Sequence, residues 1–146
     1  MRIYFETPIN LPFEKVKDQF NRELFLCLSP DLIPFELKRF DGCKKGDEVH
    51  LILGPKGFRQ EWVSLITLDE TTEKGWSFID EGTKLPWPLK TWKHQHRVDK
   101  VSDTECRIVD DIQYQCSPTF MGPWMKPFLW SVFAVRPGRY KKFFKE

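Results

Sequence analysis

The chain has 146 residues, of which 40% are hydrophobic and 30% are charged, so it can bury one substantial core but not two. Its 23 basic and 21 acidic residues give a formal charge of +2, which is too small for the electrostatic footprint of a nucleic-acid-binding protein. We therefore expect a single domain, residues 1–146, that does not bind nucleic acid.

Aromatic side chains are unusually abundant in this sequence. The chain contains 13 Phe, 6 Trp and 3 Tyr, which together make 15% of its residues. So many large rings in a small domain indicate either a bulky core or a cavity lined with apolar faces.

The sequence carries no recognisable targeting or redox signal. Residues 1–4 lack the regions of a signal peptide, and charges interrupt every hydrophobic run well short of a membrane span. The 4 cysteines form no C-x-x-C pair. We expect reduced thiols, no stable membrane insertion and a cytoplasmic location.

The first part of the chain predicts a strand, two short helices and a series of strands. Residues 2–7 alternate between polar and apolar, as in a half-buried strand. Val16, Phe20 and Leu24 have helical spacing, and a break near Asn21 divides this segment into two short helices. Strand-like composition follows at residues 35–40, 48–53, 58–68 and 75–80, with a polar turn at residues 69–74.

The next strand directs two histidines toward the interior. Trp92, His94 and His96 share one face, and the opposite face carries the long cationic side chains that must meet water. After a turn near residues 101–103, the following strand directs Asp110 inward as well. Burying an ionisable group without a partner costs on the order of several kcal/mol. These side chains therefore pair with one another or line a partly polar space.

The pairing of these two strands can also be predicted. Both inward faces are even-numbered, so the connecting loop must have an odd length, and we expect Lys100 opposite Thr104. His94 then lies opposite Asp110. The carboxylate would hold one imidazole nitrogen and direct the other into the cavity, as an anchor for a ligand's carbonyl or carboxylate.

Residues 118–146 have the composition of a helix, which should be the longest in the molecule. Large side chains recur at helical spacing: Leu129, Phe133, Arg136, Tyr140 and Phe143. Pro137 and Gly138 weaken this helix in its middle, so a kink near Val135 is expected. We expect residues 128–135 to pack into the concavity of the sheet.

Several residues in this order resemble a known family. They are Trp62 with Ile66, Phe78 with Asp80, Gly82, the Trp92-x-His94-x-His96 triplet, Asp110-x-Ile112-x-Tyr114, and Arg136. The chain resembles the SRPBCC and START-like helix-grip superfamily, and most nearly the small bacterial ligand-binding SRPBCC proteins described as cell-division-inhibitor-like. The resemblance implies an α+β fold in which a curved antiparallel sheet wraps around a long C-terminal helix, with two short helices after the first strand. It also implies an elongated cavity for a hydrophobic small molecule. Two departures are Pro137-Gly138 in the helix and the stiff Pro86-Trp87-Pro88 before the histidine strand.

The candidate ligand-binding residues are Trp62, Trp92, His94, His96, Asp110, Ile112, Tyr114 and Phe133. For the two histidines, hydrogen bonding inside the core is favoured over metal ligation, because a single His-x-His lacks a spaced third ligand. A carboxylate such as Asp110 would complete a metal set, which keeps that alternative open. No cofactor, no metal and no catalytic residue is assigned. The basic clusters at residues 44–45, 136–139 and 141–142 are interpreted as solvated faces, with a weak membrane-surface or protein contact through the C-terminal helix as the alternative.

Three functional classes remain. The first is a carrier or sensor that binds a lipid-like, acyl or aromatic molecule, which fits the aromatic content. The second is an enzyme of the polyketide cyclase or hydrolase type that uses a cavity histidine as general acid or base. The third is a partner-binding domain without a ligand. The absence of an assembled nucleophile favours the first class.

Overall fold

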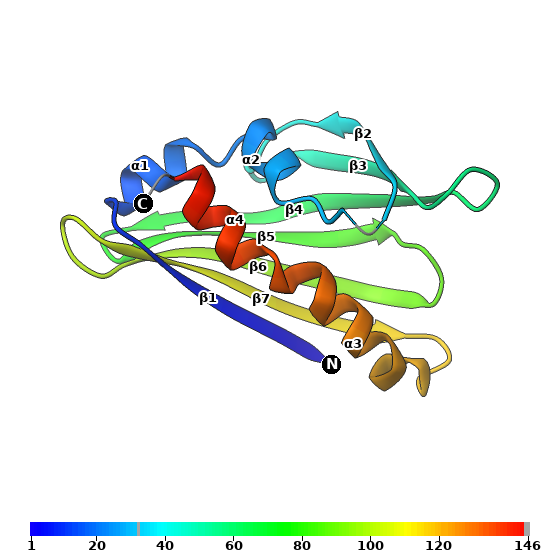
Figure 1. The fold of residues 1–146 in the computed structure, drawn as a ribbon. Helices are drawn as coiled ribbons and strands as arrows, with labels where there is room; N and C mark the ends of the chain where they lie inside the picture. Colours follow the sequence, from blue (N-terminus) through cyan, green and yellow to red (C-terminus); the bar gives the residue numbers. More distant parts are fainter. Residues whose placement is uncertain (32, 145–146) are drawn as a thin grey trace.

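The computed structural model describes residues 1–31 and 33–144, and Figure 1 shows one large sheet crossed by a long helical segment. The sheet has seven strands, all paired antiparallel, in the order β1-β7-β6-β5-β4-β3-β2. The strands are β1 (Arg2–Ile9), β2 (Phe35–Phe40), β3 (Glu48–Leu53), β4 (Gln60–Thr72), β5 (Gly75–Lys84), β6 (Leu89–Lys100) and β7 (Cys106–Cys116). The helices are α1 (Phe13–Asp18), α2 (Arg22–Cys27), α3 (Met121–Ala134) and α4 (Arg136–Phe143). This is the α+β helix-grip architecture that the resemblance implied, with two short helices after β1.

The C-terminal segment is broken where the sequence predicts a kink. Val135 ends α3 and caps α4, and Pro137 lies in the first turn of α4, where its missing N–H would have had no helical acceptor. Leu129 and Phe133 are buried against the sheet, whereas Phe128 and Val135 are 45% and 36% exposed. The stretch expected to fill the concavity therefore buries one face only. Residues 145–146 of the predicted helix lie outside the described residues.

Two apolar clusters hold the helices to the sheet. In the first, α1, α2 and α4 pack on the strands through residues such as Phe13, Trp76 and Tyr140. In the second, α3 covers β6 and β7 through Trp92 and Phe133, among others. Within the described residues, 1–31 and 33–144, no helix is both long enough and apolar enough to cross a bilayer.

Two strand predictions differ from the structure. The sequence predicts a polar turn at residues 69–74, but β4 continues to Thr72. Most of the expected turn is therefore strand that pairs with β5, as Thr71 does with Trp76. In the β6–β7 hairpin the predicted register is wrong by two residues, since Lys100 pairs with Cys106 and His94 with Ile112. The loop spans residues 101–105, whereas the predicted register requires a loop of residues 101–103. Its length is still odd, so the inward faces of both strands are as predicted.

Candidate functional site

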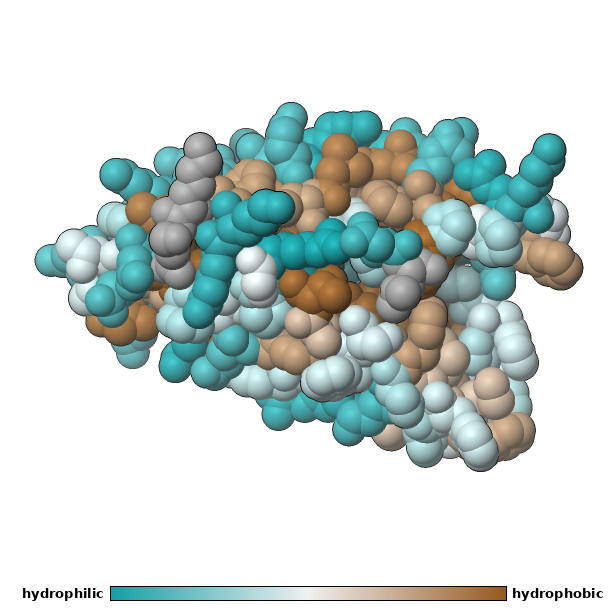
Figure 2. All heavy atoms as spheres, in the orientation of Figure 1, coloured by the Kyte–Doolittle hydropathy of each residue, from teal (hydrophilic) through white to brown (hydrophobic). Residues whose placement is uncertain are grey.

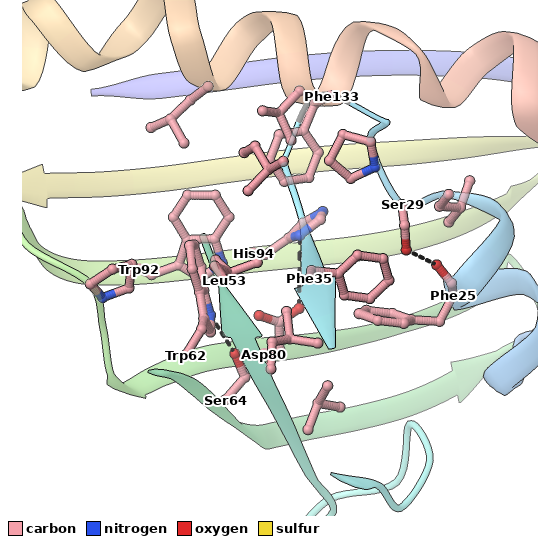
Figure 3. Close-up of a pocket in the computed structure, with 18 of the residues that line it drawn as sticks. Phe25, Ser29, Phe35, Leu53, Trp62, Ser64, Asp80, Trp92, His94 and Phe133 are labelled. Carbon is pink, nitrogen blue, oxygen red and sulfur yellow. Dashed lines mark hydrogen bonds and ion pairs between the residues drawn. The ribbon is translucent and has the colours of Figure 1, made fainter. Parts of the chain in front are cut away.

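A cavity of about 430 Å³ lies between the concave face of the sheet and the helices (Figure 3). This volume is within the range of about 300–1,000 Å³ that is typical of small-molecule sites. Most of its wall is apolar. The apolar lining includes Leu24, Phe25, Phe35, Val49, Leu51, Leu53, Trp62, Ile66, Phe78, Trp92, Leu129 and Phe133. These side chains come from α2, α3 and strands β2 to β6, so the cavity depends on the whole curved sheet.

A pair of tryptophans forms one wall of the cavity. The Trp62 and Trp92 rings meet edge to face with centroids 4.7 Å apart, and Phe133 lies 5.8 Å from Trp92. Trp62 Nε1 donates a hydrogen bond of 3.0 Å to Ser64 Oγ, as Figure 3 shows. Because this indole N–H is satisfied within the wall, the pair can offer apolar ring surface to a ligand.

Two loops contribute exposed aromatic side chains to the lining of the cavity. Phe58 in the β3–β4 loop is 78% exposed and Trp87 in the β5–β6 loop is 68% exposed, yet both contribute to the lining. The Trp87 backbone N–H donates to Gln60 Oε1 at 3.0 Å and so ties one loop to the start of β4. On the face drawn in Figure 2, hydrophobic side chains also reach the surface among the hydrophilic ones.

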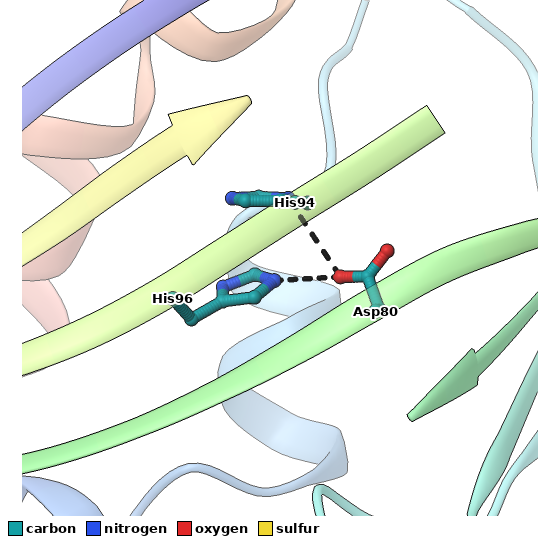
Figure 4. A group of neighbouring side chains, drawn as sticks. All are labelled: Asp80, His94 and His96. Atoms are coloured by element: carbon teal, nitrogen blue, oxygen red, sulfur yellow. Dashed lines mark hydrogen bonds and ion pairs between the residues drawn. The ribbon is translucent and has the colours of Figure 1, made fainter. Parts of the chain in front are cut away.

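The polar end of the cavity is built from neighbouring strands β5 and β6. Asp80 pairs with His94 across the two strands, and His96 follows two residues later on the same face. His96 Nε2 lies 2.7 Å from Asp80 Oδ2, and His94 Nδ1 lies 3.8 Å from the same oxygen. Figure 4 shows this carboxylate oxygen facing both rings, whose centroids are 3.5 Å apart. His96 stacks on Phe78 with its other face, at 4.2 Å.

Asp110 on β7 lies behind the histidines and receives three donors. His94 Nε2 approaches at 2.8 Å, Arg136 Nη1 at 3.0 Å and the Tyr140 hydroxyl at 3.2 Å. Burial by itself would raise the pKa of Asp110, but the Arg136 guanidinium and the His94 hydrogen bond hold that pKa well below its usual value. The carboxylate is therefore ionised and accepts all three hydrogen bonds.

The electrostatics also define the state of His94. Burial, with His96 beside it, lowers the pKa of His94 to about 4 despite its contact with Asp110. The imidazole is neutral near pH 7. Since Asp110 can only accept, the proton of His94 is on Nε2, and Nδ1 carries a lone pair that faces the cavity end.

The candidate residues from the sequence fall into three groups in the structure. Trp62, Trp92, His94, His96 and Phe133 line the cavity. Asp110 is buried behind His94. Ile112 and Tyr114 belong to the apolar cluster under α3, where the Tyr114 hydroxyl donates to the Gly122 carbonyl at 2.8 Å.

Two charged residues of the site were missed by the sequence reasoning. Asp80 is the carboxylate closest to His96, and its alternation with Trp76 and Phe78 along β5 was a signal for an inward position. The solvated interpretation of the cluster at residues 136–139 is wrong for Arg136, whose side chain is 12% exposed and paired with Asp110. Its helical spacing from Phe133 already placed it on the buried face.

No activated nucleophile is present among the described lining residues. Cys43 lies in the wall, but burial, together with nearby carboxylates, raises its pKa to about 12, so its thiol stays protonated. The site can bind apolar groups and can accept hydrogen bonds at its polar end.

The chain matches no protein-family model and no curated protein by sequence. Three solved structures illustrate its similarity in three dimensions. Norcoclaurine synthase from Thalictrum flavum has a TM-score of 0.68 at 12% identity, over 100% of this chain and 87% of that one. A protein from Thermobifida fusca has a TM-score of 0.67 at 16% identity, over 98% and 92%. The Zhui aromatase/cyclase from a Streptomyces species has a TM-score of 0.61 at 10% identity, over 98% and 95%. The chain therefore shares the helix-grip fold of these proteins.

Proposed function

We propose that residues 1–146 form one cytoplasmic domain that binds a hydrophobic small molecule, as a carrier or sensor. The observation that supports this most is the cavity of about 430 Å³ with a largely apolar wall. A protein that only packed its core would fill such a space with side chains, because protein interiors are close-packed. An aromatic or acyl group fits between the Trp62–Trp92 pair and the phenylalanines on the other side (Figure 3).

The polar end of the cavity suggests which group of the ligand it receives. His94 Nδ1 is an acceptor without a proton, and Asp80 is a carboxylate, so both can accept a hydrogen bond from a ligand. A hydroxyl or an amine therefore suits these two groups, whereas the Arg136 guanidinium, which also lines the cavity, can donate to the carbonyl or carboxylate expected from the sequence. Norcoclaurine synthase, which shares the fold, has been solved with dopamine and hydroxybenzaldehyde, both small aromatic molecules.

A second candidate function is acid–base catalysis on a bound aromatic substrate. It is favoured by one observation: each cavity histidine lies within 2.8 Å of a carboxylate that orients it. The aromatase/cyclase among the structures with this fold is an enzyme by its name. The carrier role needs fewer groups, since the described lining holds no activated nucleophile.

Binding is tested with the neutral fluorescent probe phenylnaphthylamine, excited through the tryptophans. We expect saturable energy transfer and quenching of tryptophan emission in the wild type. Val49→Phe adds a ring to the cavity wall and should weaken binding at least about tenfold, by displacing the ligand from part of the space. Val101→Phe is the matched control, since Val101 lies in the β6–β7 loop and is 57% exposed. Equal affinity in all three proteins would overturn the proposal and favour a partner-binding domain without a ligand.

A further inference from the structure

The buried cluster at the polar end of the cavity holds more negative than positive charge. It contains the carboxylates of Asp80 and Asp110, and Arg136 is the one guanidinium in contact with this pair among the described residues, at 3.0 Å from Asp110 Oδ1. Two carboxylates in this cluster therefore share one guanidinium, and the remaining polar groups are the two imidazoles of His94 and His96. Burying a net charge is costly, so the cluster is suited to receive one more cation.

The imidazole nitrogens show where this cation would bind. His94 donates its Nε2 proton to Asp110, so Nδ1 presents a lone pair toward Asp80 Oδ2 at 3.8 Å, with no hydrogen between these two acceptors. His96 directs Nε2 at the same oxygen at 2.7 Å. Its Nδ1 is buried and, within residues 1–31 and 33–144, has no hydrogen-bond partner. His96 itself is 8% exposed.

We propose that Asp80, His94 and His96 bind a divalent transition-metal ion through a carboxylate oxygen, Nδ1 and Nε2 respectively. These ligand atoms lie within 4.8 Å of one another, and the Asp80 carboxylate oxygen faces both imidazole rings (Figure 4). Metal–ligand bonds of about 2.0–2.2 Å would draw them together by small side-chain movements. Two imidazoles and one carboxylate suit Zn²⁺ or Fe²⁺, and three ligands on one side leave further coordination positions open toward the cavity.

Asp110 supplies the outer support that such a site needs. Histidines that bind metals usually donate their other N–H to a carboxylate, and His94 already donates Nε2–H to Asp110 at 2.8 Å. Asp110 Oδ1 also lies 3.7 Å from His96 Nδ1. When His96 Nε2 binds the ion, the N–H of this ring is on Nδ1. The buried nitrogen without a partner then becomes a donor that faces Asp110. One positioning residue thus serves both histidines.

The binding experiment uses the full chain, freed of metal with a chelator and titrated with Zn²⁺ by calorimetry. We expect one ion per chain. Asp80→Asn and His96→Gln should each lower the affinity at least about tenfold. His50→Gln is the matched control, because His50 on β3 is the third histidine of the chain and lies outside the cluster. Circular dichroism verifies that each variant is folded. A wild-type protein that takes up no ion, or a His50→Gln variant that loses as much affinity as His96→Gln, would overturn the proposal.

A second measurement on the wild type does not depend on any variant. Nitrogen-15 NMR of the imidazoles reports which nitrogen of His96 is protonated. We expect the proton on Nε2 in the metal-free protein and on Nδ1 when Zn²⁺ is bound. If His96 keeps its Nε2 proton at saturating Zn²⁺, the ion binds elsewhere and the proposal is wrong. Both readouts are independent of whether the cavity holds an organic ligand.

Discussion

Asp110 shows how one buried side chain can organise the site. It accepts hydrogen bonds from β6 and from α4, and thereby fixes His94 in one tautomer and holds the Arg136 guanidinium in place. The Tyr140 hydroxyl is the third donor to this carboxylate. Burial and the nearby negative charge of Asp110 both raise the pKa of Tyr140. The polar end of the cavity and the packing of α4 therefore depend on the same carboxylate.

We predict that Asp110→Asn lowers the free energy of unfolding by about 3–5 kcal/mol, because it leaves the guanidinium of Arg136 buried without its counter-ion. The neighbouring substitution Asp111→Asn breaks a pair with Arg2, whose side chain is 59% exposed, and should cost less than about 1 kcal/mol. Urea denaturation of the two variants measures the difference. Equal losses in both would contradict the assigned role of Asp110.

The residues of the site were only partly predictable from sequence. The alternation along β6 and β7 placed His94, His96 and Asp110 on the inner face, and the structure shows the His94–Asp110 contact. Asp80 was missed because the sequence did not specify the pairing of β5 with β6, so the acid in the next hairpin was taken as the partner of the histidines.

At the level of elements, sequence patterns located strands and helices better than they fixed register. The predicted strands at residues 35–40 and 48–53 and the kink near Val135 are confirmed. The β6–β7 register differs from the prediction by two residues, because the loop contains the five residues 101–105 and not only residues 101–103. Val101 and Ser102 both donate backbone N–H groups to the Glu105 carbonyl there. The positions of the apolar residues decide whether the number of loop residues is odd or even. The length of the loop depends on local hydrogen bonds, which the pattern of polar and apolar residues does not contain.

Two glycines provide a matched pair of predictions about the elements. Gly75 begins β5 with φ +143°, and a Cβ at this position would lie 2.2 Å from the Val98 carbonyl oxygen. Gly75→Ala should therefore lower the free energy of unfolding by about 2–3 kcal/mol. Gly138 lies inside α4, where an added Cβ would meet nothing within 4 Å, so Gly138→Ala should raise the free energy of unfolding by about 0.5–1 kcal/mol. Thermal or urea unfolding measures both. A stabilising Gly75→Ala would show that the strained hairpin is not formed.

For the whole molecule, the order of elements was sufficient to predict the helix-grip fold, but not the dimensions of its interior. The aromatic content indicated either a bulky core or a cavity, and the structure contains both: two apolar clusters and a space of about 430 Å³ with members of each in its wall. Which rings pack together and which face open space depends on rotamers and sheet curvature. Neither property is contained in a pattern of polar and apolar residues.

The central claim is that the cavity accommodates a hydrophobic small molecule. The most direct measurement is a crystal structure of the protein grown with phenylnaphthylamine. We predict electron density for the probe inside the cavity, in contact with Trp62, Trp92 and Phe133, with its amine directed toward Asp80 and His94. Density for the probe on the outer surface alone, or a cavity filled by protein side chains, would contradict the account.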